Sequence, residues 1–136
     1  MSSNWVDDIE YMHDKYGVWE VVNKMDRETL RALLDFRIKF LQEELDELRG
    51  ANNPDDVIDA LIDLCVVAIG TLDMLDAPTR SSWDRVLEAN MAKEVGVKES
   101  RPNPLGLPDL IKPTGWKAPY HGPTYGHILD KLFPLT

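Results

Sequence analysis

The chain has 136 residues, of which 43% are hydrophobic and 29% charged, so it is long and apolar enough to fold as one globular domain. Its formal net charge of −9 argues against general binding to nucleic acid or anionic membranes. Cys65 is the single cysteine, which excludes an intrachain disulfide. The N-terminus carries acids where a signal peptide needs bases, and the longest apolar run is too short to cross a bilayer. We therefore expect a cytoplasmic protein with no membrane partner.

Two short helices are expected first. Ser3 is a suitable N-cap for a helix that Gly17 interrupts, and a further turn of helix is expected from Val18 to Lys24. His13 falls on what reads as a surface helix, so we expect its imidazole to be solvated.

The longest helix is predicted from Arg27 to Arg49, between an N-cap at Asp26 and a closing glycine, Gly50. Apolar residues recur on this helix at intervals of three and four, which predicts a stripe that faces the core. The members of this stripe are Leu30, Leu34, Ile38, Leu41, Leu45 and Leu48. A second row beside this stripe carries Arg37 together with apolar and acidic side chains.

A second long helix is predicted to begin at Asp55 or Asp56 and to fray near Pro78. Residues 57–75 are apolar on nearly every side, which is the pattern of a buried helix. The loop before this helix is short, so the two long helices should form an antiparallel hairpin.

A third long element is expected to start at a cap on Ser81 or Ser82. No segment alternates at period two over the length of a strand, so the fold class is all-α. Prolines and glycines concentrate after Gly96, yet this part is too apolar to be free and disordered. We expect an all-α domain over residues 1–96 that carries the functional site. A tail over 97–136, with a short helix near its end, is expected to pack on the body or on a neighbouring subunit.

Acidic residues on the two long helices form the strongest functional signal. Residues three or four apart share one face of a helix, so Glu44 and Glu47 project together, as do Asp59 and Asp63. A carboxylate in an apolar helix must be paired, solvated in a cleft or bound to metal. Two such helices that face each other make an oxygen-rich site suited to Mg²⁺ or Mn²⁺. The alternative is a solvated acidic face, to which Glu43 is expected to belong.

The third element adds an amide and a cation three residues apart, Asn90 and Lys93. Asn90 interrupts an apolar stripe, and the alternative is a core asparagine whose side chain bonds to the backbone. Lys93, considered alone, would be an ordinary surface lysine. Beside carboxylates, the two side chains suit a phosphate group held next to metal ions. Arg37 and Trp116 complete the candidate substrate-binding residues.

The order and spacing of these motifs resemble the MazG-like, all-α nucleoside triphosphate pyrophosphohydrolases. The resemblance covers roughly residues 25 to 95, and residues 112–119 look like the tail of small phage-type members. The family signature is Glu-Glu-x-x-Glu, then Glu-x-x-Asp, then Asn-x-x-Lys. These elements correspond here to Glu43-Glu44-Leu45-Asp46-Glu47, Ala60-Leu61-Ile62-Asp63 and Asn90-Met91-Ala92-Lys93. Ala60 stands where the family has a glutamate, so Asp59 or Asp56 would have to supply that ligand.

The resemblance implies hydrolysis of a nucleoside triphosphate, (d)NTP, to the monophosphate and pyrophosphate. It also implies a homo-oligomer, a dimer or a tetramer, which completes the helical hairpin into a four-helix-bundle core. Two or more Mg²⁺ or Mn²⁺ would be held by Glu44, Glu47, Asp59 and Asp63. Glu43 or Glu44 would orient the attacking water. We expect a role in remodelling the nucleotide pool and favour (d)GTP, because a purine offers the larger area for stacking on the unassigned aromatic residues.

Two alternatives stay open. Phosphoribosyl-ATP pyrophosphohydrolases share the helical acids, although they tend to be shorter and to lack the proline-rich tail. A non-catalytic acidic interaction module requires acids spread over one exposed surface, whereas several acids here lie in an apolar helix.

Overall fold

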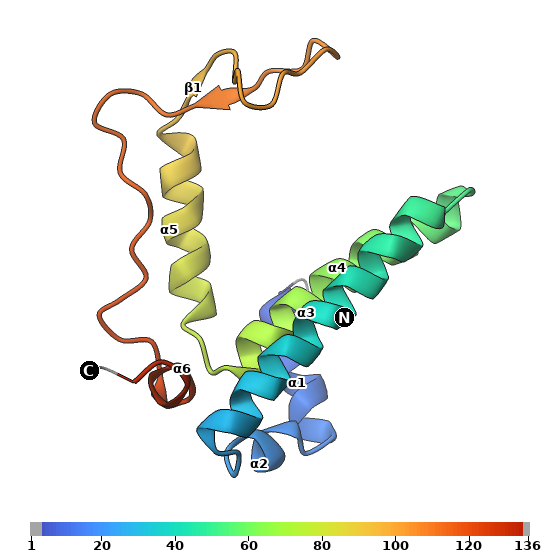
Figure 1. Ribbon diagram of the computed structural model, residues 1–136, viewed down its shortest axis with the longest axis vertical. Coiled ribbons are helices and arrows are strands. Elements are labelled where there is room, and N and C mark those ends of the chain that lie inside the picture. Colours follow the sequence, from blue (N-terminus) through green and yellow to red (C-terminus); the bar gives the residue numbers. More distant parts are fainter. Residues whose placement is uncertain (1–3, 135–136) are drawn as a thin grey trace. The chain divides into compact units, whose positions relative to one another are not determined.

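The computed structural model describes residues 4–134. Helices dominate these residues, which confirms the all-α fold class, and the one sheet is a pair of two-residue strands (Figure 1). Contacts divide the chain into two compact units, Met1–Thr79 with Thr124–Thr136 and Arg80–Pro123. No helix within the described part of the chain is long and apolar enough to cross a bilayer.

The first unit begins with two short helices, α1 (Trp5–Lys15) and α2 (Val18–Val22). Asn4 caps α1, because its side-chain oxygen accepts hydrogen bonds from the N–H groups of the second and third helical residues at 3.1 and 3.2 Å. The predicted cap, Ser3, lies outside the described residues. Gly17 separates the two helices with a φ of 67°, a left-handed conformation that glycine adopts without strain.

Two long helices, α3 (Arg27–Gly50) and α4 (Pro54–Met74), lie side by side as the predicted hairpin (Figure 1). Asp26 caps α3 by accepting from the Thr29 N–H at 2.8 Å, as expected. Asn53 caps α4 in the same way and is followed by a proline, so this helix begins slightly before the predicted acids.

The apolar core of the first unit lies where α3 begins and α4 ends. A short helix near the end of the chain, α6 (His127–Leu132), packs into it, in agreement with the helix expected there. Two further contacts hold α6: the Arg27 Nε donates to a backbone carbonyl at its end, and the Lys131 Nζ donates to the Met25 carbonyl at 2.5 Å. The buried side chains of the core are Val22, Leu30, Leu75, Ile128 and Leu132.

The expectation that α4 is buried on all sides is wrong for the single chain. Its neighbours are α3, α1 and α2, which together cover only part of its circumference. Ile38, on the predicted core stripe of α3, is likewise 54% exposed. The exposed large apolar residues of α4 are Val57, Ile58, Leu61, Ile62, Val66 and Leu72.

The expectation that His13 is solvated is also wrong. This side chain is 4% exposed, and its Nδ1 lies 2.5 Å from the Asp73 Oδ2. The reason is that α1 packs against α4, so its histidine faces the hairpin and meets an acid there. The buried carboxylate and imidazole satisfy each other, as polar groups away from water must.

The second unit consists mainly of α5 (Thr79–Met91), which begins before the predicted serine cap. After it, β1 (Glu94–Val95) pairs antiparallel with β2 (Leu110–Ile111); these strands are too short to show an alternating pattern. The chain then runs back along α5 (Figure 1), where the Trp116 Nε1 donates to the Ala89 carbonyl at 2.7 Å. Arg85 holds the same segment by donating to the Tyr120 and Gly122 carbonyls at 2.9 and 3.2 Å.

Candidate metal centre

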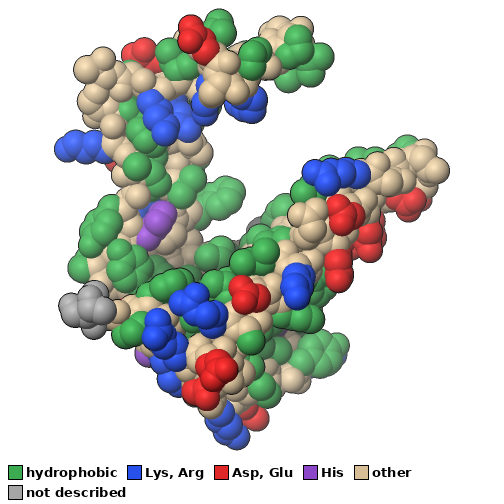
Figure 2. Space-filling view, in the orientation of Figure 1, with side chains coloured by type: hydrophobic (Ala, Val, Ile, Leu, Met, Phe, Trp, Pro, Cys, Tyr) green, Lys and Arg blue, Asp and Glu red, His purple; other side chains and the backbone are tan. Residues whose placement is uncertain are grey.

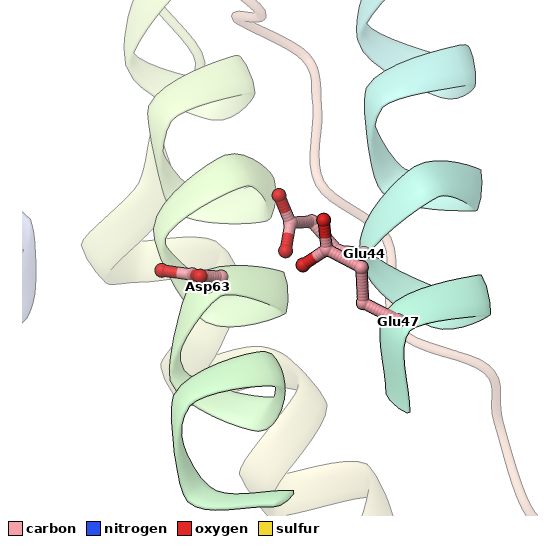
Figure 3. Close-up of side chains that lie close together, drawn as sticks. All are labelled: Glu44, Glu47 and Asp63. Atoms are coloured by element: carbon pink, nitrogen blue, oxygen red, sulfur yellow. The ribbon is translucent and has the colours of Figure 1, made fainter. Parts of the chain in front are cut away.

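Three carboxylates converge between the two helices of the hairpin. Glu44 and Glu47 extend from one turn of α3 toward α4, which carries Asp63 (Figure 3). One oxygen from each of the three groups lies within 4.8 Å of the others. The helical spacing of three residues places the two glutamates on one face, and the antiparallel partner brings the aspartate opposite.

Glu44 is the most buried member of this carboxylate cluster. The residue is 8% exposed, and its Oε2 is buried with no hydrogen-bond partner among the described residues. Burial, followed by the charges of Glu47 and Asp63, raises the pKa of this carboxyl above its ordinary value. A buried acceptor without a partner is unfavourable, and a cation would satisfy it.

The charged form of Asp63 is unfavourable for the same reasons. Its pKa is raised by burial first and then by the charges of Asp59 and Glu47. Like charges thus surround it from its own helix and from the facing one. This crowding of carboxylates is the arrangement that a bound divalent ion would relieve.

Asp59 does not belong to the three-residue cluster. It is exposed one turn before Asp63, and it lines a hollow of about 370 Å³ with Glu47 and Asp56. Ala60 is buried and lines the same hollow, at the position where the family has its glutamate. The predicted assistance of Asp59 in metal binding therefore stays a prediction. Acidic side chains gather along the outer part of the hairpin (Figure 2).

The donor set fits a hard cation. All three groups offer oxygen, which Mg²⁺ and Mn²⁺ prefer. Oxygens bound to one octahedral Mg²⁺ are about 3.0 Å apart on adjacent sites and about 4.2 Å apart on opposite sites, because each Mg–O distance is about 2.1 Å. The three oxygens lie within 4.8 Å of one another, so side-chain rotations that bring them closer would be needed to complete the coordination.

The structure does not bring Arg37 to the cluster. Its Nε donates to the Thr71 Oγ1 at 2.9 Å and its Nη2 to the Val67 carbonyl at 3.0 Å, so it joins α3 to α4. It lies seven residues before Glu44, about 10 Å along the helix. Burial lowers the pKa of the guanidinium. These contacts describe a structural link, and its predicted role in substrate binding has no support from them.

The other predicted substrate-binding residues belong to the second unit. Asn90 is exposed rather than buried in an apolar stripe. Lys93 is half-buried, with its Nζ 5.4 Å from the centre of the Trp116 ring. A residue that the sequence analysis missed, Lys112, lies 4.9 Å from the same ring centre. Only the pairing of the two strands shows this proximity, because the lysines are far apart in sequence.

An apolar hollow of about 220 Å³ lies between α1 and α4. Its lining includes Trp5, the thiol-bearing Cys65 and one carboxylate residue, Asp8. Ile62 of this lining directly precedes Asp63 in α4, although none of the three clustered carboxylates lines the hollow.

Comparisons with protein-family models, with curated proteins and with solved structures find no match for this chain.

Proposed function

We propose that this protein is a metal-dependent nucleoside triphosphate pyrophosphohydrolase of the MazG-like type. It would hydrolyse a (d)NTP to the monophosphate and pyrophosphate in the cytoplasm and so remodel the nucleotide pool. The observation that carries the proposal is the convergence of Glu44, Glu47 and Asp63 within 4.8 Å around a buried oxygen with no described partner. The motif order Glu-Glu-x-x-Glu, Asp63 and Asn-x-x-Lys supports it.

Glu44, Glu47 and Asp63 would hold Mg²⁺ or Mn²⁺, and Asp59, one turn before Asp63, would assist with a further ion. When bound, the ions supply charge neutralisation for the triphosphate oxygens and acidify a water. The protein holds the carboxylates on two rigid helices, so their oxygens need little reorganisation when substrate arrives.

Glu43 and Glu44 are the candidates for orienting and deprotonating that water. Glu43 is exposed next to the cluster, and its charge contributes to the raised pKa of Glu44. A free, exposed carboxylate can accept a proton and release it to solvent. We assign this role to Glu43, because Glu44 would be a ligand of the cation.

The base would bind in the apolar hollow between α1 and α4. Trp5 offers a face for stacking, and Asp8 offers a carboxylate that only accepts hydrogen bonds. Guanine presents two N–H donors on its Watson–Crick edge, whereas adenine presents an acceptor and a donor there. This complementarity supports a preference for (d)GTP.

The functional form would be a homo-oligomer, a dimer or a tetramer. Four large apolar side chains of α4 are exposed in the single chain and do not line the hollow between α1 and α4, so they leave apolar surface without cover among the described residues: Val57, Ile58, Leu61 and Leu72. A second hairpin packed on this face would complete a four-helix bundle.

The test is to incubate the protein with each (d)NTP and with Mg²⁺ or Mn²⁺, and to separate the products by ion-exchange chromatography. Monophosphate and pyrophosphate in equal amounts are expected. Release of orthophosphate without added pyrophosphatase would contradict the proposal. Turnover of phosphoribosyl-ATP alone would support the related enzyme class, and turnover of no nucleotide would favour the acidic interaction module.

A further inference from the structure

The strand pair places two lysines opposite each other. Glu94 pairs with Ile111 and Val95 with Leu110, so the next positions outward in this register are Lys93 and Lys112. The hydrogen bond from the Gly96 N–H to the Asp109 carbonyl, at 3.0 Å, continues the same register on the other side. Like charges directly opposite on neighbouring strands repel. The arrangement is therefore unfavourable unless something negative lies between them.

Both ammonium groups lie near the ring of Trp116. The Lys93 and Lys112 nitrogens lie 5.4 and 4.9 Å from the centre of its ring, within the range of a cation–π contact. The indole is itself fixed, because its Nε1 donates to the Ala89 carbonyl at 2.7 Å. Neither lysine has a carboxylate within ion-pair distance among the described residues. The cluster thus holds two cations on a neutral support without a counter-charge.

The surroundings favour an anion as well. Residues 80–123 contain seven Lys and Arg against five Asp and Glu, although the whole chain has a net charge of −9. Lys and Arg side chains gather around the strand pair of this unit (Figure 2). Trp116 also lines a hollow of about 540 Å³ between α5 and the segment 113–120, so the cluster adjoins a concave surface.

We infer that Lys93, Lys112 and Trp116 form an oligophosphate-binding site, in which the oxygens of one ligand bridge the two ammonium groups. Lysine is a common phosphate ligand, acting as a point charge. A pyrophosphate group carries several negative oxygens and so can meet both cations at once. The binding of the anion depends only on this cluster, whereas its assignment to the phosphates of substrate or product rests on the proposed function.

The experiment is a titration of the full chain with inorganic pyrophosphate in EDTA, followed by calorimetry and by tryptophan fluorescence. Lys112→Gln and Lys93→Gln should each weaken binding by tenfold or more. Lys98→Gln is the matched control, because it removes one exposed lysine of the same unit that does not touch Trp116; it should change binding by less than twofold. Trp116→Phe should abolish the fluorescence change and so assign it to this ring.

Thermal unfolding separates binding from a structural role. Without pyrophosphate, Lys112→Gln should leave the Tm unchanged or raise it, because a repulsion is removed, and pyrophosphate should raise the Tm of the wild type more than that of the variant. A lower Tm without ligand would instead indicate a structural lysine and overturn the inference. Equal losses of binding in Lys98→Gln and Lys112→Gln, or tighter binding of a single-stranded oligonucleotide than of pyrophosphate, would also overturn it.

Failure of the proposed function gives a different pattern. Glu47→Gln should bind pyrophosphate in EDTA as the wild type does, since the lysine cluster contains no metal ligand. If no nucleotide is turned over but this binding persists, the enzyme assignment is wrong and the anion site stands. If nucleotides are hydrolysed but Lys112→Gln binds pyrophosphate normally, the anion site is wrong and the enzyme stands.

Discussion

Glu44 of α3 and Asp63 of α4 face each other across the hairpin, and the charge of Asp63 contributes to the raised pKa of Glu44. Two carboxylates from different helices would separate if each were only a solvated surface group. Here helix packing holds them together, one of them buried. In the folded protein without metal, the repulsion between these carboxylates is therefore unfavourable.

Removing a cluster carboxylate should remove activity. Glu47→Gln or Asp63→Asn is expected to lower kcat/KM for the preferred (d)NTP by about 100-fold or more, since the loss of a ligand should cost several kcal/mol of transition-state stabilisation. Steady-state kinetics at saturating Mg²⁺ checks this. Asp46→Asn is the control: Asp46 lies in the same acidic run, but its carboxylate bonds to the exposed side chains of Gln42 and Arg49. Near-full turnover in Glu47→Gln would contradict the site.

Glu43→Gln should separate proton transfer from metal binding. We expect turnover to fall by about 100-fold or more, as is typical of losing a general base, while the affinity for Mn²⁺ stays within about twofold. Kinetics together with titration of Mn²⁺ by electron paramagnetic resonance measures both quantities. A loss of Mn²⁺ affinity would make Glu43 a metal ligand instead.

The stability of the metal-free protein should depend on pH through the cluster. Because the folded-state pKa values of Glu44 and Asp63 are raised, their contribution to stability is fully present below the unfolded carboxyl pKa of about 4. It is lost as the pH rises through the folded-state values. In EDTA, Glu44→Gln should therefore have a higher Tm than the wild type at pH 7, with a difference that vanishes near pH 4.

Addition of metal should reverse the order of the Tm values of the wild type and Glu44→Gln. Mg²⁺ at about 100 times its Kd should stabilise the wild type by about 2.7 kcal/mol, and Glu44→Gln much less. Thermal unfolding with and without Mg²⁺ measures both shifts, and Asp46→Asn should follow the wild type throughout. A wild-type Tm that does not change when Mg²⁺ is added would argue against a cation site.

The preference for a guanine nucleotide should depend on Asp8. We expect Asp8→Ala to lower kcat/KM for dGTP by about tenfold, the equivalent of one hydrogen bond to a charged group, and to leave dATP nearly unchanged. Asp7→Ala is a matched control, because Asp7 is the adjacent exposed acid and does not line the hollow. A pyrimidine preference of tenfold or more in the wild type would refute the purine assignment.

Assembly should depend on the exposed face of α4. Ile58 is 61% exposed, so Ile58→Asp should leave the fold of the chain intact and shift the protein toward monomer in sedimentation velocity. Tyr11 is 76% exposed on α1, and Tyr11→Asp should keep the oligomer. A wild type that stays monomeric at micromolar concentration would contradict the proposed assembly.

The helices and the pairing of the carboxylates could be predicted because they depend on local spacing. Asp26 as a cap, the hairpin, and Glu44, Glu47 and Asp63 on facing surfaces all follow from residues three or four apart and one short loop. The burial of His13 could not be predicted in this way, because it depends on which side of α1 meets α4.

Contacts between distant residues were missed for the same reason. Lys112 reaches Trp116 beside Lys93 only through the register of two strands that are too short to leave a pattern. The exposed face of α4 shows a further limit, since apolar periodicity indicates that a surface is covered but not by which chain.

Gly70, in the middle of α4, reads in the sequence as a weak helix residue. A methyl group there would lie 2.9 Å from the Arg37 Nη2, a nitrogen held in place by its bond to the Val67 carbonyl. The guanidinium group of Arg37 occupies the space that a side chain at Gly70 would need, so Gly70→Ala would force it to shift, although alanine has the better helix propensity. The missing side chain at Gly70 therefore leaves room for one of the contacts that join α3 to α4, the hydrogen bond from Arg37 to the Val67 carbonyl.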